Sequence, residues 1–204
     1  MNGLRAKIER GIIQKGRGWA FTRKDLRDIA PSGQLGVILS RLVSAGMIRR
    51  IGRGLFEYPR QSRLLEEVLP PDIDGTARAI ARKHRWTIAP HGAMAANVLG
   101  LSQQVPARIV YLSDGPTRKL EVGRQTITFR HARPKDLRQE HYSSRMIANA
   151  LRFLGRQNVN DSVIRHLQRK LPSIEKARFL RDARYGTDWV FEIAQRVAAR
   201  GSRG

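Results

Sequence analysis

Residues 32–58 read SGQLGVILSRLVSAGMIRRIGRGLFEY, and this stretch decides the fold of the N-terminal part of the chain. Its first half places apolar residues at offsets of three, four and seven positions, the spacing of one helix face. This predicts a helix over 34–45. The second half predicts two strands, 47–51 and 55–58, joined by a tight basic turn at 52–54.

Working toward the N-terminus, the pattern predicts two more helices, over 4–14 and 23–30. Thr22 precedes the second one and Asp25 lies three residues later, which is the spacing of a capping box. The resulting order of helix, helix, helix, strand, basic turn and strand is the plan of a winged helix-turn-helix. We therefore expect residues 1–60 to form a DNA-binding domain of this kind.

The remainder of the chain predicts a linker helix over 61–71 and a C-terminal domain over 72–204. A β-hairpin is expected where strands 118–122 and 125–129 flank a Gly-Arg turn, and basic helices follow from residue 143. The expected fold class is α+β, with an N-terminal winged helix-turn-helix followed by a mixed α/β domain that contains a hairpin and C-terminal helices.

The charge of the chain indicates a polyanionic partner. Its 204 residues include 39 Lys and Arg against 17 Asp and Glu, a formal net charge of +22, and such an excess repels itself unless phosphates neutralise it. No run of about 18 apolar residues predicts a membrane span, and the N-terminus lacks an apolar signal core. With no cysteine available as a ligand, we expect a cytoplasmic bacterial protein without membrane, cofactor or metal.

The predicted third helix offers a face that can read DNA. Gln34 suits adenine, Val37 a thymine methyl group, and Arg41 guanine or phosphate. Arg53 at the tip of the turn suits a minor groove or a phosphate. The full set of predicted DNA-contacting residues is Arg17, Arg23, Lys24, Ser32, Gln34, Val37, Ser40, Arg41, Arg49, Arg50 and Arg53.

Signals for catalysis are sparse. The five histidines show no metal-binding spacing, and no catalytic residue is predicted. His91 and Asp114 would form a base and its orienting carboxylate if the fold brought them together. The sequence favours a structural interpretation, in which His91 begins a helix after Pro90 and Asp114 lies in a turn.

Several runs resemble the AbiEi-type antitoxins over about residues 1–185. The matching runs are Gly18-Trp19-Ala20-Phe21-Thr22, Leu39-Ser40-Arg41-Leu42-Val43, Gly46-Met47-Ile48-Arg49-Arg50-Ile51-Gly52-Arg53-Gly54-Leu55-Phe56, Pro90-His91-Gly92-Ala93, Ala95-Ala96-Asn97-Val98-Leu99-Gly100-Leu101, Gln104-Val105-Pro106-Ala107 and Tyr111-Leu112-Ser113-Asp114-Gly115-Pro116. The resemblance implies a type IV toxin–antitoxin system. The antitoxin of such a system represses its own operon through the winged helix and counteracts a nucleotidyltransferase-like toxin without a stable complex.

The functional expectation is sequence-specific binding of double-stranded DNA at the protein's own operator, as an autorepressor and antitoxin, by a monomer or a homodimer. One alternative is non-specific binding of DNA or RNA through the basic helices, which would show a steep salt dependence and little sequence discrimination. A second alternative is an enzyme that acts on nucleic acid with His91 and Asp114 in its site.

Overall fold

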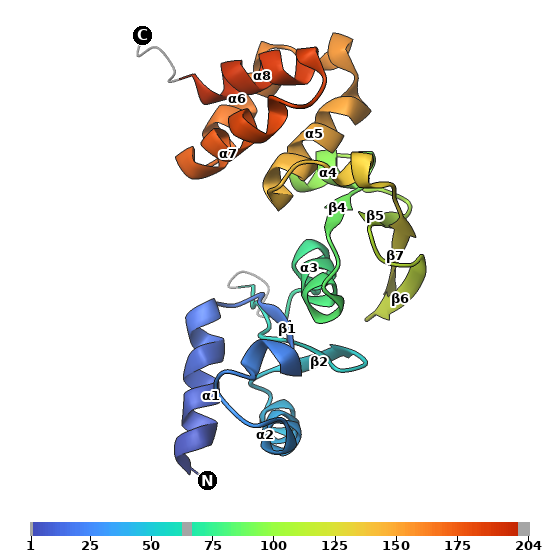
Figure 1. The fold of residues 1–204 in the computed structure, drawn as a ribbon. Coiled ribbons are helices and arrows are strands. Elements are labelled where there is room, and N and C mark those ends of the chain that lie inside the picture. Colours follow the sequence, from blue (N-terminus) through green and yellow to red (C-terminus); the bar gives the residue numbers. More distant parts are fainter. Residues whose placement is uncertain (1, 63–66, 200–204) are drawn as a thin grey trace. The chain divides into compact units, whose positions relative to one another are not determined.

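The computed structural model describes residues 2–62 and 67–199 and has the expected mixed α+β composition (Figure 1). The chain divides into two compact units. The first unit contains the residues up to Trp86 together with Lys119–Ile127, and the second contains Thr87–Arg118 and the residues from Thr128 onward. The boundary therefore lies later than the predicted one at residue 72, and the first unit is discontinuous in sequence.

The first unit alternates helices with a small sheet. Its strands are antiparallel in the order β1-β3-β2, and a bulge between Arg50 and Gly52 shifts the register of β2 against β3. The elements are α1 (Asn2–Lys15), β1 (Ala20–Thr22), the 3₁₀ helix η1 (Arg23–Leu26), α2 (Ser32–Ser44), β2 (Arg49–Gly52), β3 (Leu55–Glu57) and α3 (Ile73–His84).

The apolar periodicity of α1 and α2 creates the core of the first unit. Leu35, Leu39 and Leu42 of α2 are fully buried and pack with the apolar face of α1. Phe21 of β1 is also fully buried and stacks between Trp19 and Phe56. Because α2 buries one face here, the orientation of its opposite, polar face is fixed by core packing.

Two predicted helices of this region differ from the structure. Residues 23–26 form a 3₁₀ helix that ends in a turn, instead of an α-helix over 23–30. Pro31 disfavours helical geometry at the residue before it, which leaves too few residues for a stable α-helix. The predicted linker helix over 61–71 is wrong for the residues that are described, because Gln61 pairs with Val68 in an antiparallel bridge. Residues 63–66 of that prediction lie outside the described residues.

The second unit combines part of a four-stranded sheet with a helical layer. The sheet has the order β4-β5-β7-β6, and the tip of its β6–β7 hairpin belongs to the first unit. The hairpin and the series of C-terminal helices lie where the sequence predicted them. The elements are β4 (Ile88–Pro90), α4 (Gly92–Val98), β5 (Ile109–Ser113), β6 (Arg118–Val122), β7 (Gln125–His131), η2 (Pro134–Leu137), α5 (Tyr142–Leu154), η3 (Arg156–Asn158), α6 (Asp161–Lys170), α7 (Ser173–Ala183) and α8 (Asp188–Ala198).

A core of small and aliphatic residues joins the helices of the second unit. Ile147, Ala148 and Leu151 of α5 are fully buried and pack with residues of α4, α6, α7 and α8. Among the described residues, no helix combines the length and the apolar character that crossing a membrane requires.

Candidate nucleic-acid interface

The face of α2 opposite the core carries the residues predicted to read DNA. Gln34, Ser40 and Arg41 are exposed, and Val37 keeps 55% of its surface accessible although it is apolar. Ser32 begins the helix. This face thus combines short, apolar and long basic side chains in one accessible row, as the periodicity predicted.

A basic pocket lies beside this helix. It has a volume of about 320 Å³. Lys24 donates a hydrogen bond from Nζ to the backbone oxygen of Lys83 at 2.7 Å, which joins η1 to the last turn of α3. The pocket is lined by Thr22, Arg23, Lys24, Arg27, Gly54 and Lys83. Four of these six residues are cationic and none is acidic, so the pocket suits an anion such as a phosphate.

Two of these cationic side chains lie close to the backbone of a glycine. A Cβ atom built on Gly36 of α2 would lie 3.6 Å from Nη1 of Arg23, so this guanidinium lies against the helix. Gly54, in the turn between β2 and β3, has a φ of +68°, a left-handed conformation that glycine adopts without strain. A Cβ atom at Gly54 would lie 4.0 Å from the Lys83 ammonium, so the turn and the end of α3 are neighbours.

The turn also faces the tip of the β6–β7 hairpin. The backbone N–H of Gly123 donates a hydrogen bond to the oxygen of Ile51 at 3.2 Å, which partly covers the outer edge of β2. A pocket of about 630 Å³ between them is lined by Arg50, Ile51, Gly52, Arg53, Leu55, Ile80, Lys83, His84, Lys119, Leu120, Glu121, Val122 and Gly123. The lining contains four Lys and Arg residues and a single carboxylate. This pocket therefore extends the basic surface around the turn.

Arg49 has a structural role that argues against its predicted contact with DNA. Its guanidinium is 2.6 Å from a carboxylate oxygen of Glu57, a fully buried residue directly opposite on β3. It also donates a hydrogen bond to the backbone oxygen of Leu69 at 2.6 Å. A charge that neutralises a buried carboxylate is not available to a phosphate. We therefore remove Arg49 from the interface.

The other predicted basic residues remain accessible. Arg50 and Arg53 are exposed. Arg17 is exposed as well, but it donates a hydrogen bond to the oxygen of Pro59 at 2.9 Å and lies 4.8 Å from the ring of Tyr58. Sequence analysis missed Lys83 and Lys119, which come from α3 and β6. The basic run that ends α3 was a signal, but nothing local tied it to the turn.

His91 and Asp114 do not converge. In the antiparallel pair of β4 and β5, the N–H of His91 bonds to Val110, whereas Asp114 accepts a hydrogen bond from the N–H of Thr87 at 2.8 Å. The two residues therefore lie at opposite ends of the strand pair, about 13 Å apart at 3.3 Å per residue. This geometry does not place a carboxylate where it would orient the His91 ring.

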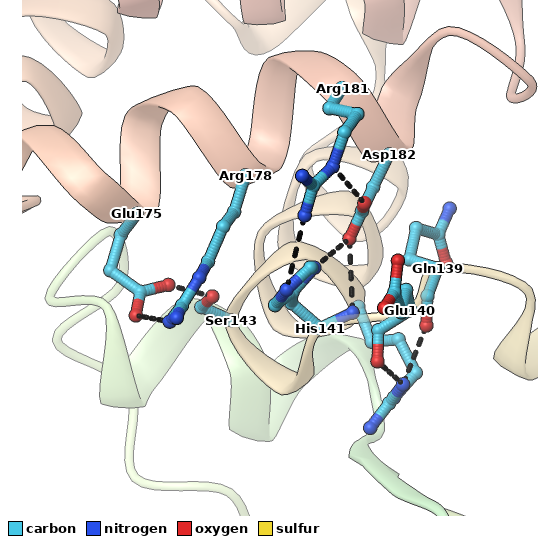
Figure 2. A network of polar contacts seen from close by, with 9 residues as sticks. Gln139, Glu140, His141, Ser143, Glu175, Arg178, Arg181 and Asp182 are labelled. Carbon is cyan, nitrogen blue, oxygen red and sulfur yellow. Dashed lines mark hydrogen bonds and ion pairs between the residues drawn. The ribbon is translucent and has the colours of Figure 1, made fainter.

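A second polar cluster occupies the junction of α5 and α7, and sequence analysis did not anticipate it (Figure 2). Asp182 of α7 accepts hydrogen bonds from the backbone N–H of His141 at 3.0 Å and from its ring Nδ1 at 2.9 Å. Arg181 lies 3.3 Å from the other ring nitrogen. Arg145 is buried and donates to the backbone oxygens of Gln139 and Glu140, which fixes the segment before α5.

Glu140, His141 and Asp182 place their ligand atoms within 4.8 Å of one another. One Asp182 oxygen is already engaged twice by His141, and the guanidinium of Arg181 lies 3.9 Å from the other. An adjacent positive charge opposes the binding of a cation. The arrangement therefore fits a structural network between the two helices better than a metal site.

A family model described as a family of unknown function, DUF6088, matches residues 7–179. The chain belongs to the DUF6088 family. The match begins in α1 and ends in α7, so the DUF6088 region includes residues of both units. A search of curated proteins found no match. The DUF6088 description carries no link to AbiEi-type antitoxins, so that resemblance remains an expectation.

The Asp182 carboxyl of this DUF6088 protein should make the free energy of unfolding depend on pH in the acidic range. Burial alone would raise the pKa of Asp182, but the hydrogen bonds from His141 outweigh it and hold this pKa below its usual value. Its contribution is therefore present above the ordinary aspartate pKa of about 3.9 and is lost as pH falls through the lower folded value. We expect Asp182→Asn to lower the free energy of unfolding at neutral pH by about 1.5–3 kcal/mol.

Urea unfolding at about pH 7, 5 and 3 measures this effect. The variant should lose less stability than the wild type between about pH 5 and 3, because the group that titrates there has been removed. Asp28→Asn removes an exposed carboxylate and should retain the wild-type slope. Identical slopes for Asp182→Asn and the wild type would show that the pair with His141 adds nothing to acid sensitivity.

Proposed function

We propose that the first unit is a winged helix-turn-helix that binds double-stranded DNA with sequence specificity. In this proposal α2 is the recognition helix and the β2–β3 turn is the wing. The observation that supports it most is the exposed polar face of α2 beside a pocket with four cationic side chains and no acidic one. A reading surface next to a phosphate-binding surface is the arrangement that duplex recognition requires.

The chemistry of α2 suits a major groove about 12 Å wide. Gly33 and Ser40 are small and exposed, so the helix backbone can approach base edges closely. Gln34 offers an amide that pairs with adenine, and Arg41 offers a guanidinium that pairs with guanine. The accessible side chain of Val37 suits a thymine methyl group, which gives a physical reason for its exposure.

Three aromatic residues near α2 favour binding of a duplex over binding of a single strand. Single-strand binding relies on exposed aromatic rings on which bases stack. Phe21 is buried, and the partly buried rings of Trp19 and Phe56 stack against it. They are therefore engaged in packing, and the cations around α2 are better suited to the phosphates of a double helix.

The AbiEi resemblance extends this proposal to repression of the protein's own operon and to neutralisation of a nucleotidyltransferase-like toxin without a stable complex. These two roles depend on the resemblance alone. A gene for such a toxin beside the gene of this protein would support the antitoxin role. Without such a gene, only the proposed role as a transcriptional regulator would stand.

The test is the binding of the purified protein to its own upstream DNA and to a random duplex of equal length, each at two salt concentrations. We expect the upstream DNA to bind at least about 1,000-fold more tightly, the lower end of specific recognition. Equal and equally salt-sensitive binding would contradict sequence specificity and would favour a non-specific DNA- or RNA-binding role.

Gln34→Ala should relax sequence discrimination. If Gln34 makes a bidentate contact with one adenine, its loss reduces the preference for that base pair by about 1–3 kcal/mol and leaves binding to random DNA unchanged. Gln14→Ala, which changes an exposed glutamine of α1, is the matched control. Titration against operators with single base substitutions measures the effect, and equal losses on operator and random DNA would exclude a base-reading role.

A further inference from the structure

A pocket in the second unit combines positive charge with an exposed aromatic ring. It has a volume of about 510 Å³, which falls within the range of about 300–1,000 Å³ for small-molecule sites. Its chemically distinctive lining residues are His91, Arg130, His131, Arg133, Arg152 and Phe153. They come from the segment before α4, the end of β7 with the residues after it, and the end of α5.

The charges of this pocket favour an anion. The lining contains three arginines and one carboxylate. The carboxylate belongs to Asp136 and lies 3.7 Å from Arg133. Among the described residues, the side chain of Arg130 makes neither a hydrogen bond nor an ion pair, and it is exposed. Arg152 donates one hydrogen bond to Asn149 at 3.3 Å. Since a guanidinium has five N–H donors, Arg130 and Arg152 retain donors for the oxygens of a phosphate.

The aromatic side of the pocket suits a flat ring. Phe153 is 49% exposed although it lies at the end of α5, a helix that otherwise buries its apolar face. A Cβ atom on Gly92 would lie only 2.6 Å from Cβ of Phe153, so the start of α4 packs closely against this residue. The half-buried side chain of Leu112 adds a second apolar contact. A nucleic-acid base can stack on such a ring, whatever its sequence identity.

The two histidine rings add polar nitrogen atoms to the lining of the pocket. Burial, and then the charge of Arg130, lower the pKa of His91, so its ring is neutral at neutral pH. Nδ1 of His131 lies 3.0 Å from the backbone oxygen of Gly115, which requires a proton on Nδ1 because a carbonyl oxygen only accepts. Nε2 of His131 can then face a ligand.

We propose that this pocket binds a free mononucleotide, with its phosphate at Arg130 and Arg152 and its base against Phe153. The proposal goes beyond DNA binding by α2 and does not depend on it. A neighbouring pocket of about 700 Å³ shares Arg152 and adds Arg138 and Arg181, but Asp136, Glu140 and Asp182 line it as well. The three carboxylates balance its three arginines, so the proposal places the phosphate at Arg130 and Arg152 alone.

Calorimetric titration of the full chain tests the proposal with the four nucleoside 5′-monophosphates, adenosine, ribose 5-phosphate, inorganic phosphate and a short single-stranded oligonucleotide. At least one mononucleotide should bind tenfold or more tightly than adenosine, ribose 5-phosphate and phosphate. If ribose 5-phosphate or phosphate binds as well as the mononucleotides, the base has no site and the proposal is wrong. Binding of the oligonucleotide alone would also overturn it, because the pocket would then accept part of a nucleic acid.

Three variants assign the contacts. Arg130→Gln and Arg152→Gln should each weaken mononucleotide binding at least tenfold. Phe153→Leu should remove the preference for a mononucleotide over ribose 5-phosphate. Arg165→Gln, at an exposed position on α6, is the control of equal charge change. Among the described residues, the exposed side chain of Arg130 has no hydrogen bond or ion pair to lose, so its variant should fold. Unchanged affinity of Arg130→Gln would exclude this pocket even if Arg152→Gln unfolded.

Duplex DNA binding by the same variants separates this proposal from the first one. Arg130→Gln and Phe153→Leu should retain the wild-type preference for the upstream DNA, because both residues belong to the second unit. Loss of nucleotide binding with intact DNA binding supports two separate sites. If the protein binds a mononucleotide but shows no sequence-specific DNA binding, the proposal for this pocket stands. Only the proposed role of α2 in DNA recognition is then contradicted.

Discussion

Replacing Arg49 with alanine should lower the free energy of unfolding by about 2–3 kcal/mol. Removing one partner of a buried ion pair costs about 3–5 kcal/mol, and we reduce that range because the Arg49 side chain is 29% exposed. The carboxylate of Glu57 is fully buried, and its second oxygen has no hydrogen-bond partner among the described residues. Without the guanidinium, this charge would remain unpaired in the core of the first unit.

Urea unfolding followed by circular dichroism measures the loss. Arg50→Ala is the matched control, because this neighbouring arginine is exposed and should change stability by less than about 0.5 kcal/mol. The double variant Arg49→Ala/Glu57→Gln should be more stable than Arg49→Ala alone, because the unpaired charge is then absent. Equal losses for Arg49→Ala and Arg50→Ala would contradict the structural role of Arg49.

The triple variant Arg23→Gln/Arg27→Gln/Lys83→Gln should have the largest effect on DNA binding. Each phosphate contact contributes about 0.9 to the slope of log affinity against log salt. Loss of three contacts should therefore reduce this slope by about three units and weaken binding at 0.1 M salt by roughly 100-fold or more. The effect should be similar on operator and random DNA, because phosphates carry no sequence information.

The control for this prediction removes the same net charge elsewhere. Arg165→Gln/Arg169→Gln/Arg184→Gln changes three exposed arginines of the second unit. Fluorescence anisotropy at several salt concentrations compares the two triple variants with the wild type. If both variants lose affinity equally, net charge alone would explain binding and the pocket beside α2 would have no specific role.

Local pattern predicted α1, α2 and the two strands after α2, because these elements follow from apolar spacing and glycine placement. It failed at Arg49 for a physical reason. A continuous register from the pair of Gly52 and Leu55 would place Arg50 opposite Glu57. The bulge inserts one residue and places Arg49 there instead, and a shift of one residue exchanges the two faces of a strand.

The parts of the candidate sites that depend on tertiary structure could not be predicted. Lys83 reaches the turn at Gly54 only because α3 folds back on η1. The pocket around Arg152 and Phe153 joins segments more than sixty residues apart in sequence. Charge and aromatic content indicated that such residues exist, but no local rule specifies which of them meet.

The shared hairpin limits how this chain can be dissected. The polypeptide crosses between the two units three times, after Trp86, after Arg118 and after Ile127. A fragment that ended at Trp86 would lack the N–H that bonds to Ile51, together with the buried side chains of Val122 and Ile127. No single cut therefore releases an intact first unit, and roles can be assigned to each unit only by substitutions within the whole chain.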